Sequence, residues 1–136
     1  MGVIFDSCIW VGMATGQLQQ NTILKLVAEQ PIFTSVISLG ELQYGVESCL
    51  DPAERAVRAA YLRQVESRPI LDISEGTAAA FGILAAAVKH SGRSPRQRYN
   101  DLWLAAQAIQ YGYGLLTLNR ADFSDLPGLR LLPISE

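Results

Sequence analysis

The chain has 136 residues, of which 49% are apolar and 18% are charged, and its formal net charge at pH 7 is −2. This length and composition are typical of one folded domain, so we expect residues 1–136 to form a single domain with a full hydrophobic core. They exclude intrinsic disorder, and we expect no membrane span and no signal peptide, because no stretch approaches ~18 apolar residues and the first residues (MGVIFD) lack a basic start. Two cysteines are too few for a disulfide scaffold, so a reducing, cytoplasmic setting is expected.

Short apolar runs alternate along the chain with longer segments of helical periodicity. The runs predict five strands, which lie at residues 3–5, 32–34, 70–73, 114–118 and 129–132. The longer segments predict four helices, at residues 36–47, 52–64, 75–90 and 101–111. Strands that alternate with helices of this length are typical of parallel sheets with helices on both faces. We therefore expect an α/β fold with three layers, in which a central, mostly parallel five-stranded sheet lies between helices.

Capping residues mark where the predicted helices begin and end. Ser35 and Ser74 are suitable N-caps, because a serine hydroxyl can accept a hydrogen bond from a free backbone N–H of the first turn. The segment 51–54, Asp-Pro-Ala-Glu, has the arrangement of a capping box with proline at the first helical position. Gly112 is expected to end the last helix.

Polar residues follow the predicted strands at positions where a ligand can bind. Asp6 comes directly after the first strand, and Asn119 and Asp122 follow the fourth. Glu41 lies about two turns into the helix after the second strand, and Asp101 stands at the start of the last helix. Ligands of an open parallel sheet bind outside the carboxyl ends of its strands, so we expect these side chains to converge there.

A cluster of carboxylates needs a proton or a cation. Two carboxylates ~5 Å apart repel each other by roughly 3 kcal/mol at an effective dielectric constant of ~20. Oxygen ligands without histidine or cysteine favour Mg²⁺ or Mn²⁺ over zinc. Such an ion lowers the pKa of a bound water and neutralises charge on a phosphate, which predicts hydrolysis of phosphodiester bonds. Each acid also has a structural interpretation, as a helix N-cap for Asp6, a first-turn charge for Asp101 and a turn residue for Asp122.

Four segments of the chain resemble the signature segments of PIN domains, and in particular those of the small VapC-type toxins of bacterial toxin–antitoxin pairs. They are residues 6–10 (DSCIW), 37–45 (ISLGELQYG), 100–106 (NDLWLAA) and 116–123 (LTLNRADF), and the tail 126–132 is also similar. The resemblance implies a PIN-like fold and an endoribonuclease that depends on Mg²⁺ or Mn²⁺, with Asp6, Glu41 and Asp101 as its acids. It also implies a homodimer that a cognate antitoxin inhibits.

The resemblance assigns roles to the individual acids. Asp6 and Asp101 would bind the metal directly, and Glu41 would bind it through water or orient the attacking water. Family members often carry an acid where this chain has Asn119, and many carry one where it has Asp122. Either residue can therefore be the fourth metal ligand, and the sequence leaves this choice open.

Substrate contacts are predicted in two places. Four basic residues lie within ten positions just before Asp101 and can bind RNA phosphates, although a solvated loop explains them equally well; they are Lys89, Arg93, Arg96 and Arg98. Ser7 and Thr117 can bind either the carboxylates or the scissile phosphate, and Tyr99 can stack on a base.

Two other classes of protein compete with a nuclease. A receiver-like phosphoryl-transfer domain would need a second acid close to Asp6, and the segment 6–8 (DSC) has none. A non-catalytic RNA- or protein-binding relative would keep the fold and lose the acids, three of which are present here. Cys8 and Cys49 are interpreted as ordinary apolar side chains, because neither has a metal-binding partner nearby in the sequence.

Overall fold

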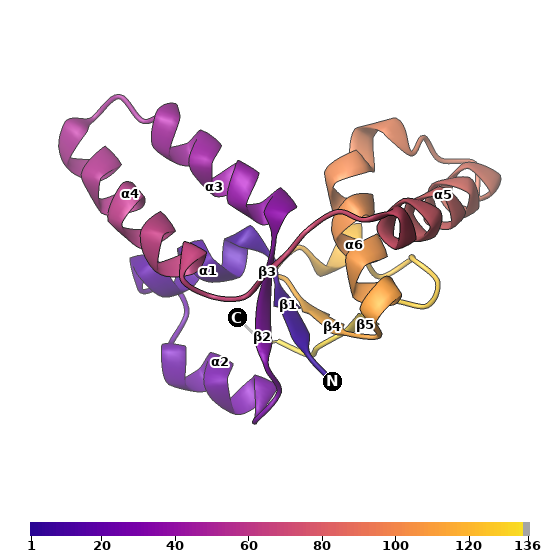
Figure 1. The fold of residues 1–136 in the computed structure, drawn as a ribbon, viewed down its shortest axis with the longest axis horizontal. Helices are drawn as coiled ribbons and strands as arrows, with labels where there is room; N and C mark the ends of the chain where they lie inside the picture. The colour runs from indigo at the N-terminus through magenta and orange to yellow at the C-terminus, as the bar shows by residue number, and fades with distance from the viewer. Residues whose placement is uncertain (135–136) are drawn as a thin grey trace.

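Five short strands form one sheet at the centre of the protein, seen in a computed structural model that describes residues 1–134 (Figure 1). The strands are β1 (Val3–Phe5), β2 (Ile32–Ser35), β3 (Ile70–Leu71), β4 (Gly114–Leu116) and β5 (Arg130–Leu131). Their order across the sheet is β3-β2-β1-β4-β5, and all four pairings are parallel. The expected parallel five-stranded sheet is confirmed.

The last three strands are shorter than the apolar runs that predicted them, because other contacts take the backbone out of the sheet. After β3, the carbonyl oxygens of Leu71 and Asp72 accept hydrogen bonds from the buried side chain of Gln107, at 3.0 and 3.2 Å. After β4, the hydroxyl oxygen of Thr117 accepts a hydrogen bond from the backbone N–H of Asn119 at 3.0 Å, which begins a turn. An apolar run therefore marks a buried segment and does not fix where strand pairing stops.

Six helices surround the sheet in residues 1–134, and the sequence predicted four of them. They are α1 (Ser7–Thr15), α2 (Gln20–Val27), α3 (Val36–Glu47), α4 (Pro52–Glu66), α5 (Glu75–His90) and α6 (Tyr99–Tyr111), with short 3₁₀ turns η1 (Arg96–Arg98) and η2 (Arg120–Asp122). The two helices that were not predicted are α1 and α2. The α1 segment is apolar nearly all round, so it has no helical periodicity. The α2 helix is short, and its N-cap residue Gln19 makes no capping hydrogen bond with its side chain.

The caps agree with the predicted helix ends, with one correction. Ser74 and Thr77 form a complete capping box at the start of α5, and Gly112 ends α6 with a φ of 70°. Asp51 accepts the backbone N–H of Glu54 at 3.4 Å. The Glu54 carboxylate instead accepts a hydrogen bond from Arg58 at 2.8 Å, so the capping box expected there is only half formed.

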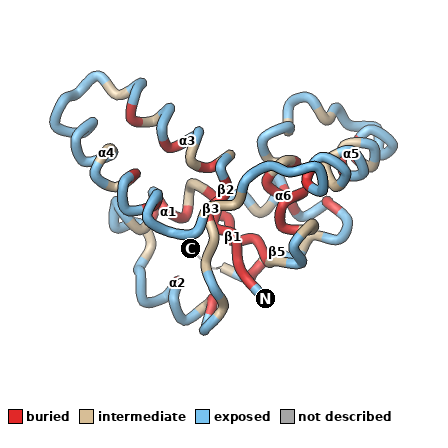
Figure 2. The backbone as a smooth tube through the Cα atoms, viewed as in Figure 1, coloured by how far each residue is buried: buried red, intermediate tan, exposed pale blue. Residues whose placement is uncertain are grey.

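Side chains of the central strand alternate between two hydrophobic cores. Val3 and Phe5 pack with apolar residues of α1, α2, α3 and α4, whereas Ile4 packs with α5 and α6 on the opposite face. Figure 1 shows the two groups of helices on either side of the sheet, and Figure 2 shows that burial is concentrated in the strands and along α6. The three-layer arrangement is therefore confirmed. None of the helices described in residues 1–134 is long and apolar enough to cross a membrane.

The strand order brings distant parts of the chain together at one end of the sheet. After β3 the chain crosses over through α5 and α6 and adds β4 on the other side of β1. The ends of β1 and β4 are joined by a hydrogen bond of 3.0 Å from the backbone N–H of Asp6 to the carbonyl of Leu116. A ligand site at this switch point would take side chains from β1, from β4 and from the helices that begin nearby.

Candidate active site

Asp6 is a buried carboxylate whose two oxygens are both held in place. It is 6% exposed. Its Oδ1 accepts the backbone N–H of Ser7, and its Oδ2 accepts the hydroxyl of Thr117, each at 2.8 Å. The first bond makes Asp6 the N-cap of α1, so the structural interpretation of this residue is correct. Capping does not exclude ligand binding, because a carboxylate oxygen can accept more than one partner.

Cys8 is a third neighbour of the Asp6 carboxylate, and the interpretation of it as an ordinary apolar side chain was wrong. Its Sγ lies 3.7 Å from Asp6 Oδ2 and 3.6 Å from Thr117 Oγ1, and it accepts the backbone N–H of Leu118 at 3.4 Å. Burial and the negative charge of Asp6 raise the pKa of the thiol, so Cys8 stays neutral beside the carboxylate. No sequence signal indicated this role, because it depends on the contact between β1 and β4.

Glu41 reaches the same end of the sheet from α3. The residue as a whole is exposed, and its Oε1 lies 3.5 Å from the hydroxyl of Ser7, a weak hydrogen bond. Its carboxyl group is close enough to the protein to lose part of its hydration, which raises its pKa to about 6 together with repulsion from Asp6 and Asp101. Glu41 therefore lies at the mouth of the site.

Asp101 approaches from the first turn of α6 and is half-buried. Its pKa is raised by burial and by repulsion from Asp6 and Asp122, and Arg98 opposes this shift. The exposed residues Asn119 and Asp122 lie at η2, just after β4. The charges of Asp6 and Asp101 act on Glu41, and those of Asp6 and Asp122 act on Asp101, so these four carboxylates lie around the same end of the sheet.

The carboxylates suit a hard cation but do not form a ready-made cage for one. Within residues 1–134, no three His, Cys, Asp or Glu side chains lie close enough together to hold a metal ion as they stand. Their donor chemistry nevertheless fits Mg²⁺ or Mn²⁺, because these ions take oxygen ligands and keep several waters. Burial raises the pKa of Glu41 and Asp101, and repulsion from neighbouring carboxylates adds to this shift; a divalent cation relieves such repulsion.

Two of the four basic residues before Asp101 are engaged with one acid. Arg98 donates two hydrogen bonds to the carboxylate of Asp125, at 3.0 and 3.1 Å, and a third to the backbone carbonyl of Asp122. Arg93 also forms an ion pair with Asp125. These contacts connect η1, at the start of α6, to the segment after β4 that carries Asp122, so Arg98 supports the site mechanically.

The other residues predicted to contact substrate differ in whether their side chains already have partners in the protein. Lys89 and Arg96 are exposed and have no ion pair within residues 1–134. Tyr99 packs edge-on against the ring of Phe81, with ring centroids 5.5 Å apart. Thr117 is 1% exposed and already bonded to Asp6, so it positions that carboxylate.

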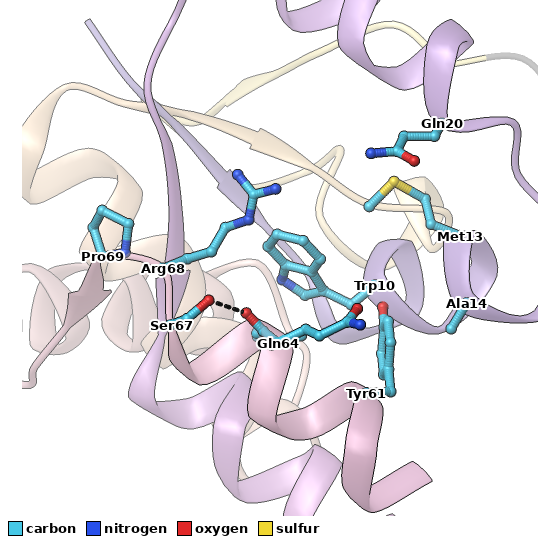
Figure 3. Close-up of a pocket in the computed structure, with 10 residues that line it drawn as sticks. Trp10, Met13, Ala14, Gln20, Tyr61, Gln64, Ser67, Arg68 and Pro69 are labelled. Atoms are coloured by element: carbon cyan, nitrogen blue, oxygen red, sulfur yellow. Dashed lines mark hydrogen bonds between the residues drawn. The ribbon is translucent and has the colours of Figure 1, made fainter. Parts of the chain in front are cut away.

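A pocket of about 620 Å³ lies between α1 and the end of α4 (Figure 3). Its wall includes Trp10, with the guanidinium of Arg68 5.4 Å from the centre of the indole ring. Ser67 donates its hydroxyl to the backbone carbonyl of Gln64 at 2.6 Å, which holds the end of α4. None of the acids of the candidate site lines this pocket. We therefore assign it no part in the reaction, despite its size.

Comparisons with known proteins place the chain in a family. The profile of the PIN domain matches residues 3–129. Ribonuclease VapC5 of Mycobacterium tuberculosis is 32% identical over 126 residues, which cover 92% of this chain and 87% of that protein. The chain belongs to the PIN domain family.

Other relatives agree with this assignment of a PIN domain, and the resemblance seen in the sequence is confirmed. Ribonuclease VapC of Rickettsia bellii is 29% identical over 140 residues, which cover 98% of this chain and 97% of that protein. The crystal structure of VapBC2 from Rickettsia felis bound to a promoter DNA fragment superimposes with a TM-score of 0.84 at 27% identity, over 99% of this chain and 100% of that one. VapBC-5 from Mycobacterium tuberculosis has the same fold, with a TM-score of 0.78 over 98% and 100% of the two chains at 23% identity.

The raised pKa of Glu41 predicts how the stability of this PIN domain depends on pH in metal-free buffer. The folded state binds the Glu41 proton more tightly than the unfolded chain, because the pKa rises from 4.5 to about 6 on folding. This contribution to stability is complete below pH 4.5 and is lost as the pH rises through about 6. Glu41→Gln cannot ionise, so it should gain stability relative to the wild type as the pH rises across this window.

Urea unfolding at several pH values checks this prediction, with Glu66→Gln, an exposed residue at the end of α4, as the matched control. The difference between wild type and Glu41→Gln should widen from pH 4.5 to pH 7. A difference that stays constant over this range would show that folding does not raise the pKa of the Glu41 carboxyl.

Proposed function

We propose that the protein is a ribonuclease that depends on Mg²⁺ or Mn²⁺, cleaves RNA internally, and acts as the toxin of a bacterial toxin–antitoxin pair. The observation that carries this proposal is the convergence of Asp6, Glu41 and Asp101 at the carboxyl end of the sheet of a PIN domain. The names of the relatives, Ribonuclease VapC5 and Ribonuclease VapC, support the reaction. The titles of the VapBC structures support an antitoxin partner.

Each acidic side chain has its own part in the proposed cleavage reaction. A bound divalent cation would supply positive charge at the scissile phosphate and lower the pKa of the attacking water. Asp6 and Asp101 would hold that cation, and Asp6 is already oriented for it by Ser7 and Thr117. Glu41, with a pKa near 6, is ionised at neutral pH and can accept the proton that the water loses as it attacks phosphorus.

The fourth metal ligand stays open between two residues at η2. Asp122 lies close enough to Asp101 to raise its pKa, which favours it. Asn119 follows β4 more directly, and its backbone is fixed by the hydrogen bond to Thr117. We propose a supporting role for both, with the ligand bound through an oxygen or through a water.

RNA would approach along the basic stretch before Asp101. We propose that Lys89, Arg93, Arg96 and Arg98 face the phosphates and that Ser7 contacts the phosphate at the site of cleavage. Lys89 and Arg96 are free to do so, whereas Arg93 and Arg98 must share their guanidinium groups with Asp125. The first pair should therefore contribute more to RNA affinity than the second.

The antitoxin needs a surface that reaches the acids. An apolar groove of about 330 Å³ runs between α1, α3 and α4, and its wall includes both Ser7 and Glu41. Val11 and Val57 are exposed on this wall, at 43% and 67% of their surface. We propose that the antitoxin packs an apolar segment here and thereby blocks the site.

Three further expectations stay predictions. The family resemblance implies a homodimer, and length and composition indicate a single-domain chain and a cytoplasmic location.

Removal of either direct metal ligand should abolish cleavage. Asp6→Asn and Asp101→Asn should each lower the rate on a fluorogenic RNA by more than about 100-fold at saturating Mg²⁺, since even changes around metal ligands commonly cost 10- to 100-fold. Mn²⁺ binding measured by calorimetry should weaken in parallel. Asp72→Asn, which alters an exposed acid after β3, is the matched control. Wild-type activity in Asp101→Asn, or cleavage that continues in EDTA, would contradict the assignment.

The free basic residues should account for part of the salt dependence of RNA binding. Replacing Lys89 and Arg96 together by alanine should lower the slope of log affinity against log salt by roughly 0.7 for each phosphate of a single strand that the variant no longer binds. Fluorescence anisotropy in EDTA measures this without cleavage, with Arg55→Ala on α4 as the control. If neither the slope nor the affinity changes, the stretch is a solvated loop and RNA binds elsewhere.

A further inference from the structure

A hollow beside Glu41 is not explained by the chemistry of phosphodiester cleavage. It has a volume of about 620 Å³ and lies between α3 and the start of α6, where it is lined by Ile37, Gly40, Glu41, Tyr44 and Asn100. Glu41 belongs to the candidate active site, and Asn100 immediately precedes Asp101. The hollow therefore includes one of the candidate acids and borders the start of the helix that carries Asp101. Its volume lies in the range of roughly 300–1,000 Å³ that is usual for small-molecule sites.

Tyr44 gives this hollow an unused aromatic wall. The residue is 73% exposed and lies three positions after Glu41 on α3, so the two side chains are neighbours on the helix surface. No aromatic ring within residues 1–134 stacks on it, in contrast to Tyr99, which packs against Phe81. An exposed tyrosine ring beside a nuclease site is a surface on which a nucleobase can stack.

Gly40 keeps the hollow open. A Cβ atom at this position would meet no other atom within 4 Å, and the backbone of Gly40 is helical with a negative φ. Neither close packing nor an unusual backbone angle therefore requires glycine here, although glycine weakens a helix interior relative to alanine. The missing side chain leaves the surface of the hollow open at this position.

The charges around the hollow select a neutral ligand group. Glu41 lines it and Asp101 follows Asn100, so a phosphate placed here would be repelled. The amide side chain of Asn100 is neutral and offers both donors and an acceptor, which match the edge of a base. Proteins that read RNA sequence commonly take up single unstacked bases in this way.

We propose that this hollow binds one unpaired base of the RNA, next to the phosphate that is cleaved. Tyr44 stacks on the face of the base, Asn100 contacts its edge, and Gly40 leaves the room that the base needs. The inference rests on the proposed ribonuclease function, and it adds the residues that would make the enzyme prefer some RNA sequences over others. A second copy of this chain and the antitoxin are the other possible occupants, and the experiment separates them.

The test compares RNA with methyl 4-nitrophenyl phosphate, a phosphodiester that has no base. The measured quantity is the ratio of kcat/KM for the RNA cut best by the wild type to kcat/KM for the small diester. Gly40→Leu, which fills the hollow, and Tyr44→Ala, which removes the ring, should each lower this ratio by about 10-fold or more. Tyr44→Phe should restore most of it, and Asn100→Ala should flatten the preference among the four bases at the position next to the cut.

Gly82→Ala is the matched control for the glycine variant, because Gly82 is a helical glycine on α5 that also has open space around it. This change should stabilise its helix and leave the ratio unchanged. An unchanged ratio in Gly40→Leu and Tyr44→Ala, with both variants folded by circular dichroism, would overturn the proposal.

Light scattering measures the oligomeric state, and a binding assay measures the affinity for the antitoxin, so together they test the two other possible occupants. If Tyr44→Ala loses RNA cleavage only because it changes the oligomeric state or the affinity for the antitoxin, the hollow is a protein interface and the proposal is wrong. Absence of RNA cleavage by the wild type, alone with Mg²⁺ or Mn²⁺, would instead overturn the ribonuclease function itself. The two failures are therefore distinguishable.

Discussion

Repulsion between carboxylates at one end of the sheet is the constraint on which the rest of the site depends. Burial raises the pKa of Glu41 and of Asp101, and the charge of the buried Asp6 raises both further. The hydrogen bonds from Ser7 and Thr117 hold the Asp6 carboxylate in place, whereas Glu41 receives only the weak hydrogen bond from the Ser7 hydroxyl. The folded chain thus holds its acids at a cost in stability that a divalent cation would offset.

The topology of the sheet explains why this arrangement forms from such distant residues. The crossover through α5 and α6 places β4 beside β1, so Thr117 reaches a carboxylate that is 111 residues away in the chain. The same crossover brings the start of α6, with Asp101, to the end of β1. Arg98 then fastens this region to the segment after β4 through Asp125. Each acid is delivered by a different element, and none of these elements can shift without moving the site.

Much of the fold could be predicted from the sequence, because its signals are local. Periodicity and caps located α3 and α5 to the residue, and the position of Asp6, Glu41 and Asp101 relative to strands indicated where they converge. The helix α1 was missed because it is apolar nearly all round, which leaves no periodic signal. Cys8, the ion pairs of Asp125 and the exposed ring of Tyr44 could not be predicted either. They depend on contacts between residues far apart in the chain, or on the absence of such contacts.

The central claim is that Asp6, Glu41 and Asp101 together bind a divalent cation. Anomalous diffraction from crystals grown with Mn²⁺ tests it most directly, because the scattering locates the metal without any assumption about activity. The account predicts a peak between the carboxylates of Asp6 and Asp101, at about 2.0–2.3 Å from their oxygens, with Glu41 bound directly or through a water. A crystal that contains Mn²⁺ at another site and none between these carboxylates would contradict the account.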